Sequence, residues 1–343
     1  MGTGALDPFQ LARATAGVGR RDFISLLGGA AIAWPLAARA QQAEKVYRVG
    51  FLGGADPTGY ATQIQALRLG LRDHGYVEGK NTTIEYRWAE GKYERLPALA
   101  TELVRDLKVD VIITQGTPAA LVAKQATTTI PIVMAIVGNP VETGIVVSLA
   151  RPGGNITGSS FFYPEINAKR LELIKDLIPG LARAGVLMNP DNPAMVSELH
   201  VMQETARAIN VELRPINVRL LDGLDTALEL ARTQIEALTV IDEGLFIANA
   251  RRIAELAIRS RLPSIGFSEH CEAGGLAAYG VDFPHIWRQS MVLVDKVLKG
   301  MKPADLPIQQ ATRFEFVINL KTAKALGLEI PPMPLARADE VVE

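Results

Sequence analysis

Few side chains in this sequence are of the types that carry out acid–base or nucleophilic chemistry, and none falls into a known catalytic pattern. The chain has four histidines and one cysteine, and the histidines do not show the spacing of a metal site. The patterns HExxH, GxSxG, GxGxxG and the phosphate-binding loop are all absent. A serine within residues 266–270 stands in a sequence similar to a nucleophile turn, but the closing glycine is missing. These features favour binding over catalysis.

Asp242 and Glu243 are the most promising carboxylates, because they directly follow a predicted buried strand. Adjacent residues point in different directions, so we expect one carboxylate to bind an amine and the other to cap a helix. His270 and Cys271 are the remaining reactive candidates. We expect His270 at the surface or at the rim of a cleft, and Cys271 as a semi-buried thiol without an activating partner.

The elements that must position these groups alternate regularly between strand and helix. The apolar patterns predict strands at residues 46–52, 82–88, 109–114, 132–137, 185–188, 211–218, 237–241, 263–267, 276–279 and 314–319. They predict helices at residues 58–74, 93–107, 118–127, 141–150, 165–177, 194–209, 224–235, 248–260, 285–298 and 321–326. Pro215 indicates that the strand at 211–218 lies at a sheet edge.

This alternation predicts the fold class. Strands separated by helices of ten to fifteen residues imply parallel sheets that are covered on both faces. Two such sets follow one another along the chain, so we expect an α/β fold of two doubly wound parallel-sheet lobes joined by a hinge.

The loops after the strands form the candidate site, since ligands of open parallel sheets bind outside the carboxyl ends of the strands. Several of these loops precede a helix whose first backbone N–H groups are free to bind a carboxylate or phosphate. An amino-acid-like solute would have its carboxylate, its ammonium and its apolar part bound by different loops, although a dicarboxylate or a nucleoside-like solute fits the same loops. The expected contacts are Gly116, Thr117 and Asn139 for the carboxylate, Asp242 or Asp56 for the ammonium, and Phe161, Phe267 or Tyr279 for the apolar part, with Gln115, Asn189 and Glu243 as further candidates.

The first forty residues have the three parts of an export signal. Arg20-Arg21 precedes an apolar run at residues 24–36, and Ala38-Arg39-Ala40 has the small-x-small pattern of a cleavage site. The run is shorter than the ~20 residues that a membrane span needs, and it contains Pro35. The paired arginines favour the twin-arginine route over the general secretory route. We expect cleavage after Ala40 and a periplasmic chain of 343 − 40 = 303 residues.

Composition narrows the class of protein further. A formal net charge of −1 argues against a nucleic-acid-binding surface. No second long apolar stretch follows the leader, which argues against a channel or a transmembrane enzyme. A single cysteine forms no internal disulfide, so stability has to come from packing. We expect a monomer without a cofactor or metal.

Four stretches carry a resemblance to a known family. They are residues 151–158 (RPGGNITG), 272–280 (EAGGLAAYG), 298–307 (LKGMKPADLP) and 314–328 (FEFVINLKTAKALGL). Together they resemble the substrate-binding proteins of ABC transporters, of the uncharacterised, tryptophan-binding-related type, over essentially the whole mature chain. The resemblance implies a type I periplasmic-binding fold, whose two lobes are joined by three crossings and close on a ligand. It also implies a permease and an ATPase as partners.

The sequence departs from this family at two places near the predicted cleft. Asp242-Glu243 stands where many relatives have Asp-Pro, and Ala277-Ala278 stands where many have Met-Ser. The ligand of the relatives therefore does not carry over to this chain from the resemblance alone.

We therefore expect the periplasmic solute-binding component of an ABC import system. The first lobe would comprise residues 45–155 and 281–306, the second residues 156–280 and 307–343, with the ligand cleft between them. One alternative is an enzyme such as a racemase or lyase on the same scaffold, which would need two titratable groups opposed across the cleft, with Cys271, His270 and Asp242 as candidates. Another is a ligand sensor that presents its closed form to a membrane receptor, which the sequence does not separate from a transport role.

Overall fold

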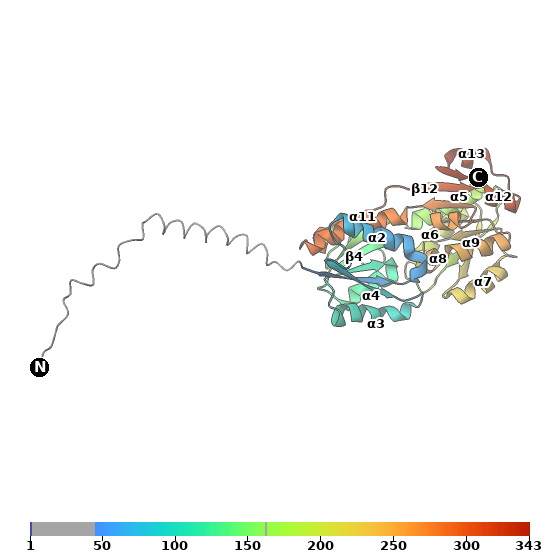
Figure 1. Cartoon of the computed structure of the whole chain (residues 1–343). Helices are drawn as coiled ribbons and strands as arrows, with labels where there is room; N and C mark the ends of the chain where they lie inside the picture. Colours follow the sequence, from blue (N-terminus) through green and yellow to red (C-terminus); the bar gives the residue numbers. More distant parts are fainter. Residues whose placement is uncertain (2–44, 162) are drawn as a thin grey trace, which may run out of the picture. The chain divides into compact units, whose positions relative to one another are not determined.

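Two sheets form the framework of the part of the chain that the structure describes (Figure 1). The computed structural model describes residue 1, residues 45–161 and residues 163–343, and residues 46–343 form a unit of their own. Apart from Met1, the predicted export signal lies outside the described residues.

The first sheet is parallel throughout and buried on both faces. Within the described ranges it has six strands in the order β11-β5-β4-β3-β1-β2. These are β1 (Tyr47–Gly53), β2 (Thr82–Trp88), β3 (Val111–Gln115), β4 (Ile132–Val137), β5 (Ile156–Ser160) and β11 (Gln309–Gln310). Every residue of β3, β4 and β5 is buried, as expected for a parallel sheet with helices on both faces. Those helices are α2 (Ala61–Asp73) and α11 (Phe283–Leu298) over one face, and α3 (Leu96–Thr101) and α4 (Gly116–Ala126) over the other (Figure 1).

The second sheet is parallel except for one antiparallel pair. Among the described residues it has seven strands in the order β13-β12-β10-β9-β8-β6-β7. These are β6 (Arg183–Met188), β7 (Glu212–Asn217), β8 (Ala237–Val240), β9 (Ser264–Gly266), β10 (Ala277–Gly280), β12 (Glu315–Asn319) and β13 (Glu340–Val342). β12 runs antiparallel to β10. β7 contains Pro215 and lies at the sheet edge, as predicted.

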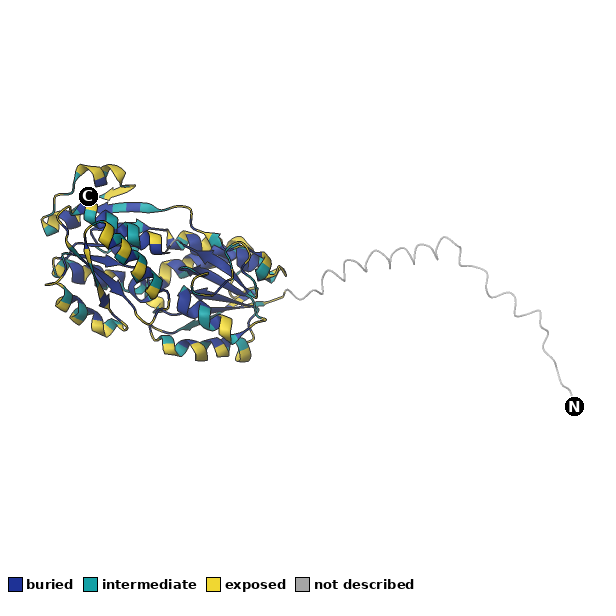
Figure 2. Ribbon diagram, turned by 180° about the vertical axis from the view of Figure 1, so that it is seen from behind, coloured by how far each residue is buried: buried dark blue, intermediate teal, exposed yellow. Residues whose placement is uncertain are grey.

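Eight helices of the described chain accompany the second sheet, and their outer faces are exposed whereas the inner strands β6, β8, β9 and β10 are mostly buried (Figure 2). They are α5 (Tyr163–Leu177), α6 (Met195–Ala208), α7 (Leu224–Ala231), α8 (Gly244–Ala248), α9 (Ala250–Arg259), α10 (Ser268–Glu272), α12 (Leu320–Leu326) and α13 (Pro332–Arg337). The two sheets with their helices form the α/β fold that the alternating pattern predicts.

The chain passes between the two sheets three times within the described residues. It leaves the first sheet after β5, returns between β10 and α11, and leaves again between β11 and β12. We refer to the first sheet with α2, α3, α4 and α11 as the first lobe, and to the second sheet with its eight helices as the second lobe.

Close packing of α11 on α2 positions one wall of the candidate site. A Cβ atom at Gly70 of α2 would lie 2.5 Å from the carbonyl oxygen of Arg288, so only glycine fits there. The helix α11 begins at Asp282, whose side chain accepts a hydrogen bond from the backbone N–H of His285 at 2.9 Å. This start places Trp287 in the second turn, fully buried against Phe51 of β1 with ring centroids 5.8 Å apart.

Sheet membership corrects the predicted lobe boundaries at two places. β5 pairs with β4 in the first sheet, whereas the sequence assigns residues from 156 onward to the second lobe. β11 also joins the first sheet, through β5, although residues 307–343 are predicted in the second lobe. The sequence of β5, Ile-Thr-Gly-Ser-Ser, contains one large apolar residue, so its burial as a central strand leaves no apolar pattern to detect.

The helix predicted over residues 141–150 is wrong, because this segment folds into turns. The Asn139 side-chain oxygen accepts from the N–H of Glu142 at 3.2 Å, and the Asn139 carbonyl accepts from the Thr143 hydroxyl at 2.7 Å. Gly144 follows with a φ of 70°. Local bonds of this kind offer the backbone an alternative to helix, and a left-handed glycine then ends any helical path.

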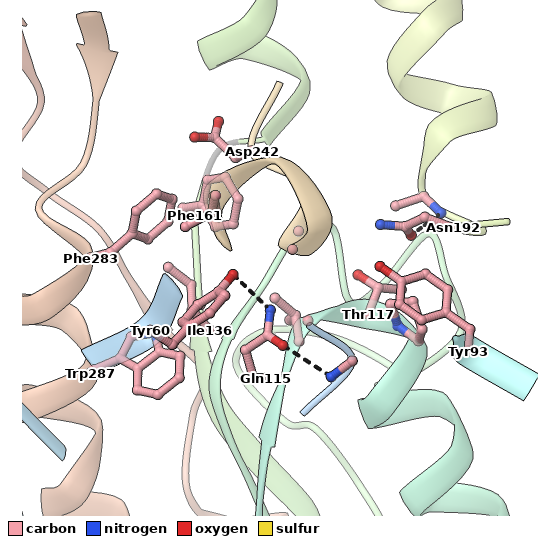
Figure 3. Close-up of a pocket in the computed structure, with 18 residues that line it drawn as sticks. Tyr60, Tyr93, Gln115, Thr117, Ile136, Phe161, Asn192, Asp242, Phe283 and Trp287 are labelled. Carbon is pink, nitrogen blue, oxygen red and sulfur yellow. Dashed lines mark hydrogen bonds between the residues drawn. The ribbon is translucent and has the colours of Figure 1, made fainter. Parts of the chain in front are cut away.

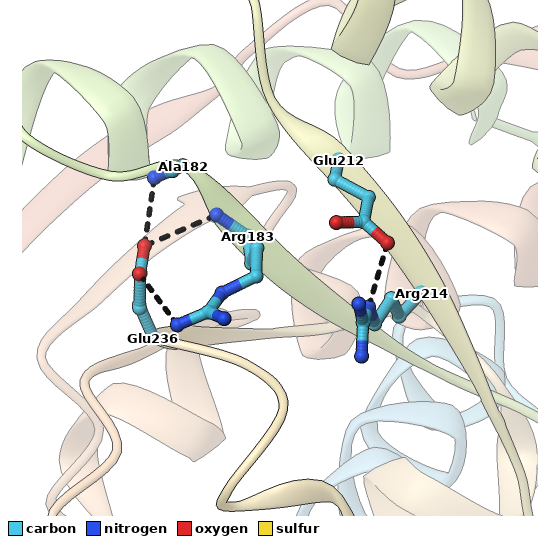
Figure 4. Close-up of polar contacts among 5 residues, drawn as sticks. All are labelled: Ala182, Arg183, Glu212, Arg214 and Glu236. Atoms are coloured by element: carbon cyan, nitrogen blue, oxygen red, sulfur yellow. Dashed lines mark hydrogen bonds and ion pairs between the residues drawn. The ribbon is translucent and has the colours of Figure 1, made fainter.

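Polar contacts hold the amino-terminal end of the second sheet, opposite to the loops of the candidate site (Figure 4). The Glu236 carboxylate accepts from the N–H groups of Ala182 at 2.7 Å and Arg183 at 3.1 Å, and from the Arg183 guanidinium at 2.9 Å. These bonds, first among them the one from Ala182, lower the pKa of Glu236. Arg214 on the neighbouring strand donates to Glu212 at 2.8 Å.

Candidate functional site

The candidate site lies where the strand order reverses in each sheet. In the first sheet β2 and β3 lie on opposite sides of β1, and in the second sheet β7 and β8 lie on opposite sides of β6. Such a reversal opens a crevice outside the carboxyl ends of the strands. The loops after β1, β3, β6 and β8 all contribute to one pocket between the lobes, with about 560 Å³ of empty space including its mouth.

Figure 3 shows Tyr60, Trp287, Phe161 and Phe283 on one side of this pocket, with Asp242 next to Phe161, and Thr117, Asn192 and the Tyr93 ring on the other side. The lining residues are Gly54, Tyr60, Tyr93, Gln115, Gly116, Thr117, Pro118, Ile136, Val137, Gly138, Phe161, Asn192, Ala194, Asp242, Gly244, Ile247, Phe283 and Trp287.

Gln115 organises the floor of the pocket rather than presenting a free amide. Its side-chain oxygen accepts from the N–H of Gly54 at 3.1 Å, and its side-chain nitrogen donates to the Tyr60 hydroxyl at 3.1 Å (Figure 3). The buried amide therefore ties the ends of β1 and β3 to the first aromatic ring of the wall. Because both bonds are buried, their loss would leave unsatisfied polar groups.

The amino-terminal end of α4 faces the pocket. The helix begins at Gly116, whose φ of 80° requires glycine, and Thr117 and Pro118 follow in the pocket lining. Gln115 at the capping position makes no side-chain bond to the first turn. Backbone N–H groups at such a helix start attract an anionic group. No lysine, arginine or histidine lines the pocket in the described chain, so this helix end is the part of the lining best suited to an anionic group.

Four aromatic rings form the opposite wall. Tyr60 stacks on Trp287 with centroids 5.7 Å apart and an angle of 29° between the rings. Phe161 meets Phe283 edge to face, with centroids 5.7 Å apart and an angle of 89°. All four rings come from the first lobe or from its crossing segments. A flat apolar group of a solute would find rings on this side and hydrogen-bonding groups on the other.

A buried ion pair stands behind the pocket. Arg170 of α5 donates to Asp242 at 2.8 Å, and the two side chains are 0% and 2% exposed. Arg170 also donates to the carbonyl oxygens of Tyr279 at 2.7 Å and Val240 at 3.1 Å. Burial raises the pKa of Asp242, and the Arg170 guanidinium opposes that rise. Asp242 lines the pocket as half of an ion pair, not as an isolated carboxylate.

Glu243 lies beside Asp242 but bonds to the start of α8 and to the first lobe. Its carboxylate is 1% exposed, and it caps α8 by accepting from the N–H of Leu245 at 2.7 Å. It also accepts a short hydrogen bond from the Tyr93 hydroxyl of the first lobe. Burial raises the pKa of Glu243. The two adjacent carboxylates therefore have separate surroundings, and Glu243 is the helix cap.

Known proteins share this chain's sequence pattern and fold. The sequence model of the ABC transporter substrate binding protein family matches residues 57–342. This chain belongs to that family. The tyrosine-binding protein of Clostridioides difficile is 31% identical to it over 260 residues, which are 76% of this chain and 74% of the relative.

Two solved structures share the architecture of this substrate-binding protein. A conserved domain protein from Vibrio cholerae is 29% identical with a TM-score of 0.80, over 87% of this chain and all of the other. The ABC domain from Streptococcus pneumoniae in complex with L-Trp is 25% identical with a TM-score of 0.78, over 86% of this chain and all of the other. The fold is thus a type I periplasmic-binding fold with two lobes.

The structure brings five of the predicted ligand-binding residues of this substrate-binding protein together in the pocket. They are Gln115, Gly116, Thr117, Phe161 and Asp242. They lie at or just after the ends of β3, β5 and β8, although no strand was predicted before Phe161.

Three of the other predicted residues bind their own loops instead. Asp56 accepts from the N–H of Thr58 at 2.9 Å and starts the short helix at Pro57–Tyr60. Asn139 holds the turn described above. Asn189 is buried and accepts from the N–H of Asp191 at 3.1 Å. None of the three lines the pocket.

Glu243 and two predicted aromatic residues also lie outside the pocket lining. Phe267 is fully buried at the start of α10. Tyr279 stacks on Phe314, with centroids 6.2 Å apart. Phe267 therefore belongs to the core of the second lobe, and Tyr279 lies at the edge of that core.

Among the pocket residues that sequence reasoning missed are its remaining aromatic side chains, Tyr60, Tyr93, Phe283 and Trp287, and it also missed Arg170 behind the pocket. The first two stand several residues beyond their strands, and the next two lie on a helix after a lobe crossing. The one sequence feature that could have indicated these four residues is that aromatic residues are scarce, at 6% of the chain. Arg170 gives no signal of this kind, since a single arginine in a helix is ordinarily solvated.

His270 and Cys271 are both buried, which corrects the expectations of a rim histidine and a semi-buried thiol. The His270 Nε2 lies 2.9 Å from the Ser264 hydroxyl, and burial lowers the His270 pKa to about 3. Burial raises the pKa of the Cys271 thiol to about 12. Neither residue lines the pocket, and no cluster of metal ligands occurs in the part of the chain that is described. No helix among the described residues has the length and apolar character to cross a membrane.

Proposed function

We propose that this substrate-binding protein is the periplasmic component of an ABC import system and that its solute is an amino acid with an aromatic side chain. The observation that carries the proposal is that one pocket combines an aromatic wall, an uncapped helix start and a carboxylate. The relatives support the same class, because one is a tyrosine-binding protein and another was solved with L-Trp.

Each part of such a solute has a matching surface. The carboxylate accepts from the backbone N–H groups and hydroxyl at Gly116 and Thr117, where the helix dipole favours negative charge. The ring lies along Tyr60, Phe283 and Trp287, which contribute a large apolar area. The ammonium binds Asp242, which also pairs with Arg170.

An enzymatic role has less support in the pocket. A racemase or lyase needs two titratable groups on opposite sides of its substrate. Of the three sequence candidates, Asp242 lines the pocket whereas His270 and Cys271 do not. A ligand sensor would bind its solute by the same closure of the lobes. It would differ from a transport component in the membrane protein that it contacts.

The location and the partners follow from the same proposal. We propose export through the leader at residues 1–40, cleavage after Ala40, and delivery of the solute to a permease with its ATPase. Replacing Arg20-Arg21 with Lys-Lys should retain the precursor in the cytoplasm if the twin-arginine route is used. An unchanged periplasmic yield would instead indicate the general secretory route.

Calorimetric titration with matched solutes tests the proposal. L-Tyrosine or L-tryptophan should bind at least about tenfold more tightly than the corresponding amine or the corresponding propionate, because each lacks one charged hydrogen-bonding group. L-Leucine lacks an aromatic ring, so it should also bind more weakly than L-tyrosine or L-tryptophan if the aromatic wall contacts the solute. Equal affinity for the amino acid and for the propionate would remove the ammonium from the proposed contacts, and the absence of binding by all of these solutes would reject the solute class.

A further inference from the structure

Two residues outside the pocket form a hydrogen bond across the two lobes. Gln63 of α2, in the first lobe, donates its side-chain amide to Glu269 of α10, in the second lobe, at 2.8 Å. Gln63 is 2% exposed, and neither residue lines the pocket. The two residues are 206 positions apart in the chain and belong to different lobes. The bond therefore exists only while the lobes are together.

A glycine next to this bond sets how closely the lobes approach. A Cβ atom at Gly59 would lie 2.2 Å from the carbonyl oxygen of Ala248 and 2.3 Å from its Cα atom. Gly59 belongs to the short helix before α2, and Ala248 ends α8 of the second lobe. Gly59 does not have a left-handed φ, so alanine fits its backbone conformation and would clash only with the opposite lobe.

We propose that Gly59, Gln63 and Glu269 form a closure latch, a contact that holds the lobes together and raises solute affinity without touching the solute. The proposal rests on the proposed function in one respect, namely that solute binds to the closed arrangement. Binding energy then depends on the latch as well as on the pocket, because any contact made only in the closed arrangement favours the ligand-competent state.

The surroundings of Glu269 make the latch sensitive to pH. One of its oxygens is buried without a hydrogen-bond partner. The groups around it are Glu272, Asp242 and Asp282 of the second lobe and its crossing, and the hydroxyl of Tyr60 from the first lobe. Burial is the main cause that raises the pKa of Glu269, to about 7, and the carboxylates add to it. No cation is among these groups.

The sign of the pH effect follows from this pKa. Separating the lobes admits water to Glu269, and its pKa falls back toward 4.5. The closed arrangement therefore binds the proton more tightly, and closure is favoured at low pH and weakened as pH rises through about 7. Solute affinity should follow the same curve and level off above pH 8.

Distance measurements between paired spin labels test the latch directly. Labels at Val147→Cys and Val196→Cys are placed on residues that are 82% and 81% exposed, one in each lobe, while Cys271 is 1% exposed and does not compete. The full mature chain is measured at pH 8 with no solute and with L-tyrosine. The labelled parent is expected to populate a short distance, and Gly59→Ala or Gln63→Glu should shift it to longer distances in both conditions.

The matched control is Gln65→Glu, the same substitution on an exposed position of the same helix. It should leave the distances unchanged. In Gln63→Glu the two facing carboxylates repel at pH 8, whereas at pH 5.5 one is protonated and donates to the other, so the short distance should return. An unchanged distribution in both Gly59→Ala and Gln63→Glu overturns the latch, and so does a parent that stays open in both conditions.

Titration with L-tyrosine separates this proposal from the proposed function. Glu269→Gln should flatten the pH dependence of affinity between pH 5 and 8, while Glu255→Gln, at an exposed position of α9, should keep the parent curve. A parent whose affinity does not fall with pH contradicts the latch even if it binds tightly. If L-tyrosine fails to bind while the ligand-free distances respond to the variants as expected, the solute assignment fails and the latch stands.

Discussion

The guanidinium of Arg170 and the carboxylate of Asp242 lie 2.8 Å apart, almost wholly excluded from water, directly behind the pocket. This pair links α5, the first element after the crossing from the first lobe, to the loop after β8. A single substitution at Asp242 therefore removes a candidate ligand contact and also leaves a buried cation without its partner.

Asp242→Ala should lower the free energy of unfolding by about 3–5 kcal/mol, because it leaves Arg170 buried and unpaired. Chemical denaturation of the mature protein measures this loss. The double variant Arg170→Met, Asp242→Leu should recover most of the stability without restoring solute binding. A loss of only about 1 kcal/mol for Asp242→Ala would contradict a strong stabilising role for the ion pair.

Phe283→Leu should weaken binding of L-tyrosine or L-tryptophan by about tenfold and leave the affinity for L-leucine nearly unchanged. The substitution removes the edge-to-face contact with Phe161 and part of the aromatic wall. Phe316→Leu is the control, since Phe316 has similar burial (4% exposed against 3%) and lies in the second sheet away from the pocket. Equal changes in both variants would mean that the aromatic wall acts only through stability.

Cys271 should not react with an aromatic disulfide reagent in the native protein at pH 8, and it should react fully after denaturation. Burial at 1% exposure and a pKa raised to about 12 both keep the thiol protonated and inaccessible. Absorbance of the released thiolate follows the reaction. Rapid native labelling would return Cys271 to the list of possible catalytic groups.

Glu236→Gln should destabilise the protein slightly, by less than about 1 kcal/mol, and should leave solute affinity unchanged. Its side chain is 37% exposed, so solvent screens much of its ion pair with Arg183. The hydrogen bonds that lower the Glu236 pKa contribute stability above the unfolded-state value, and this contribution is lost as pH falls through the folded-state value. Thermal melts at pH 7 and pH 3 should therefore differ less in the variant than in the parent protein.

The fold could be predicted from the sequence because most of its strands are apolar runs or alternate between apolar and polar residues. The predicted strand at 132–137 matches β4, and the one at 82–88 matches β2. β5 escaped detection because small polar residues pack its interior, where Gly158 lies against the backbone of Met134. The predicted helix at 141–150 failed because side-chain hydrogen bonds from Asn139 stabilise a turn there.

The candidate site was predictable only where its residues directly follow a strand. Gln115 and Asp242 were found on that ground. Trp287 was not, because it enters from a helix of a distant chain segment, and such a contact depends on how α11 packs on the first sheet. Arg170 reaches Asp242 across 72 positions, a pairing that no local pattern reveals.

Native mass spectrometry of the mature protein, purified from the periplasm without denaturation, tests the central claim most directly. The account predicts a bound solute in the pocket whose mass is that of an aromatic amino acid, retained unchanged through prolonged incubation. A dicarboxylate, a nucleoside or a sugar in its place would contradict the assigned solute class. Conversion of the bound solute into a product during incubation would contradict binding without turnover.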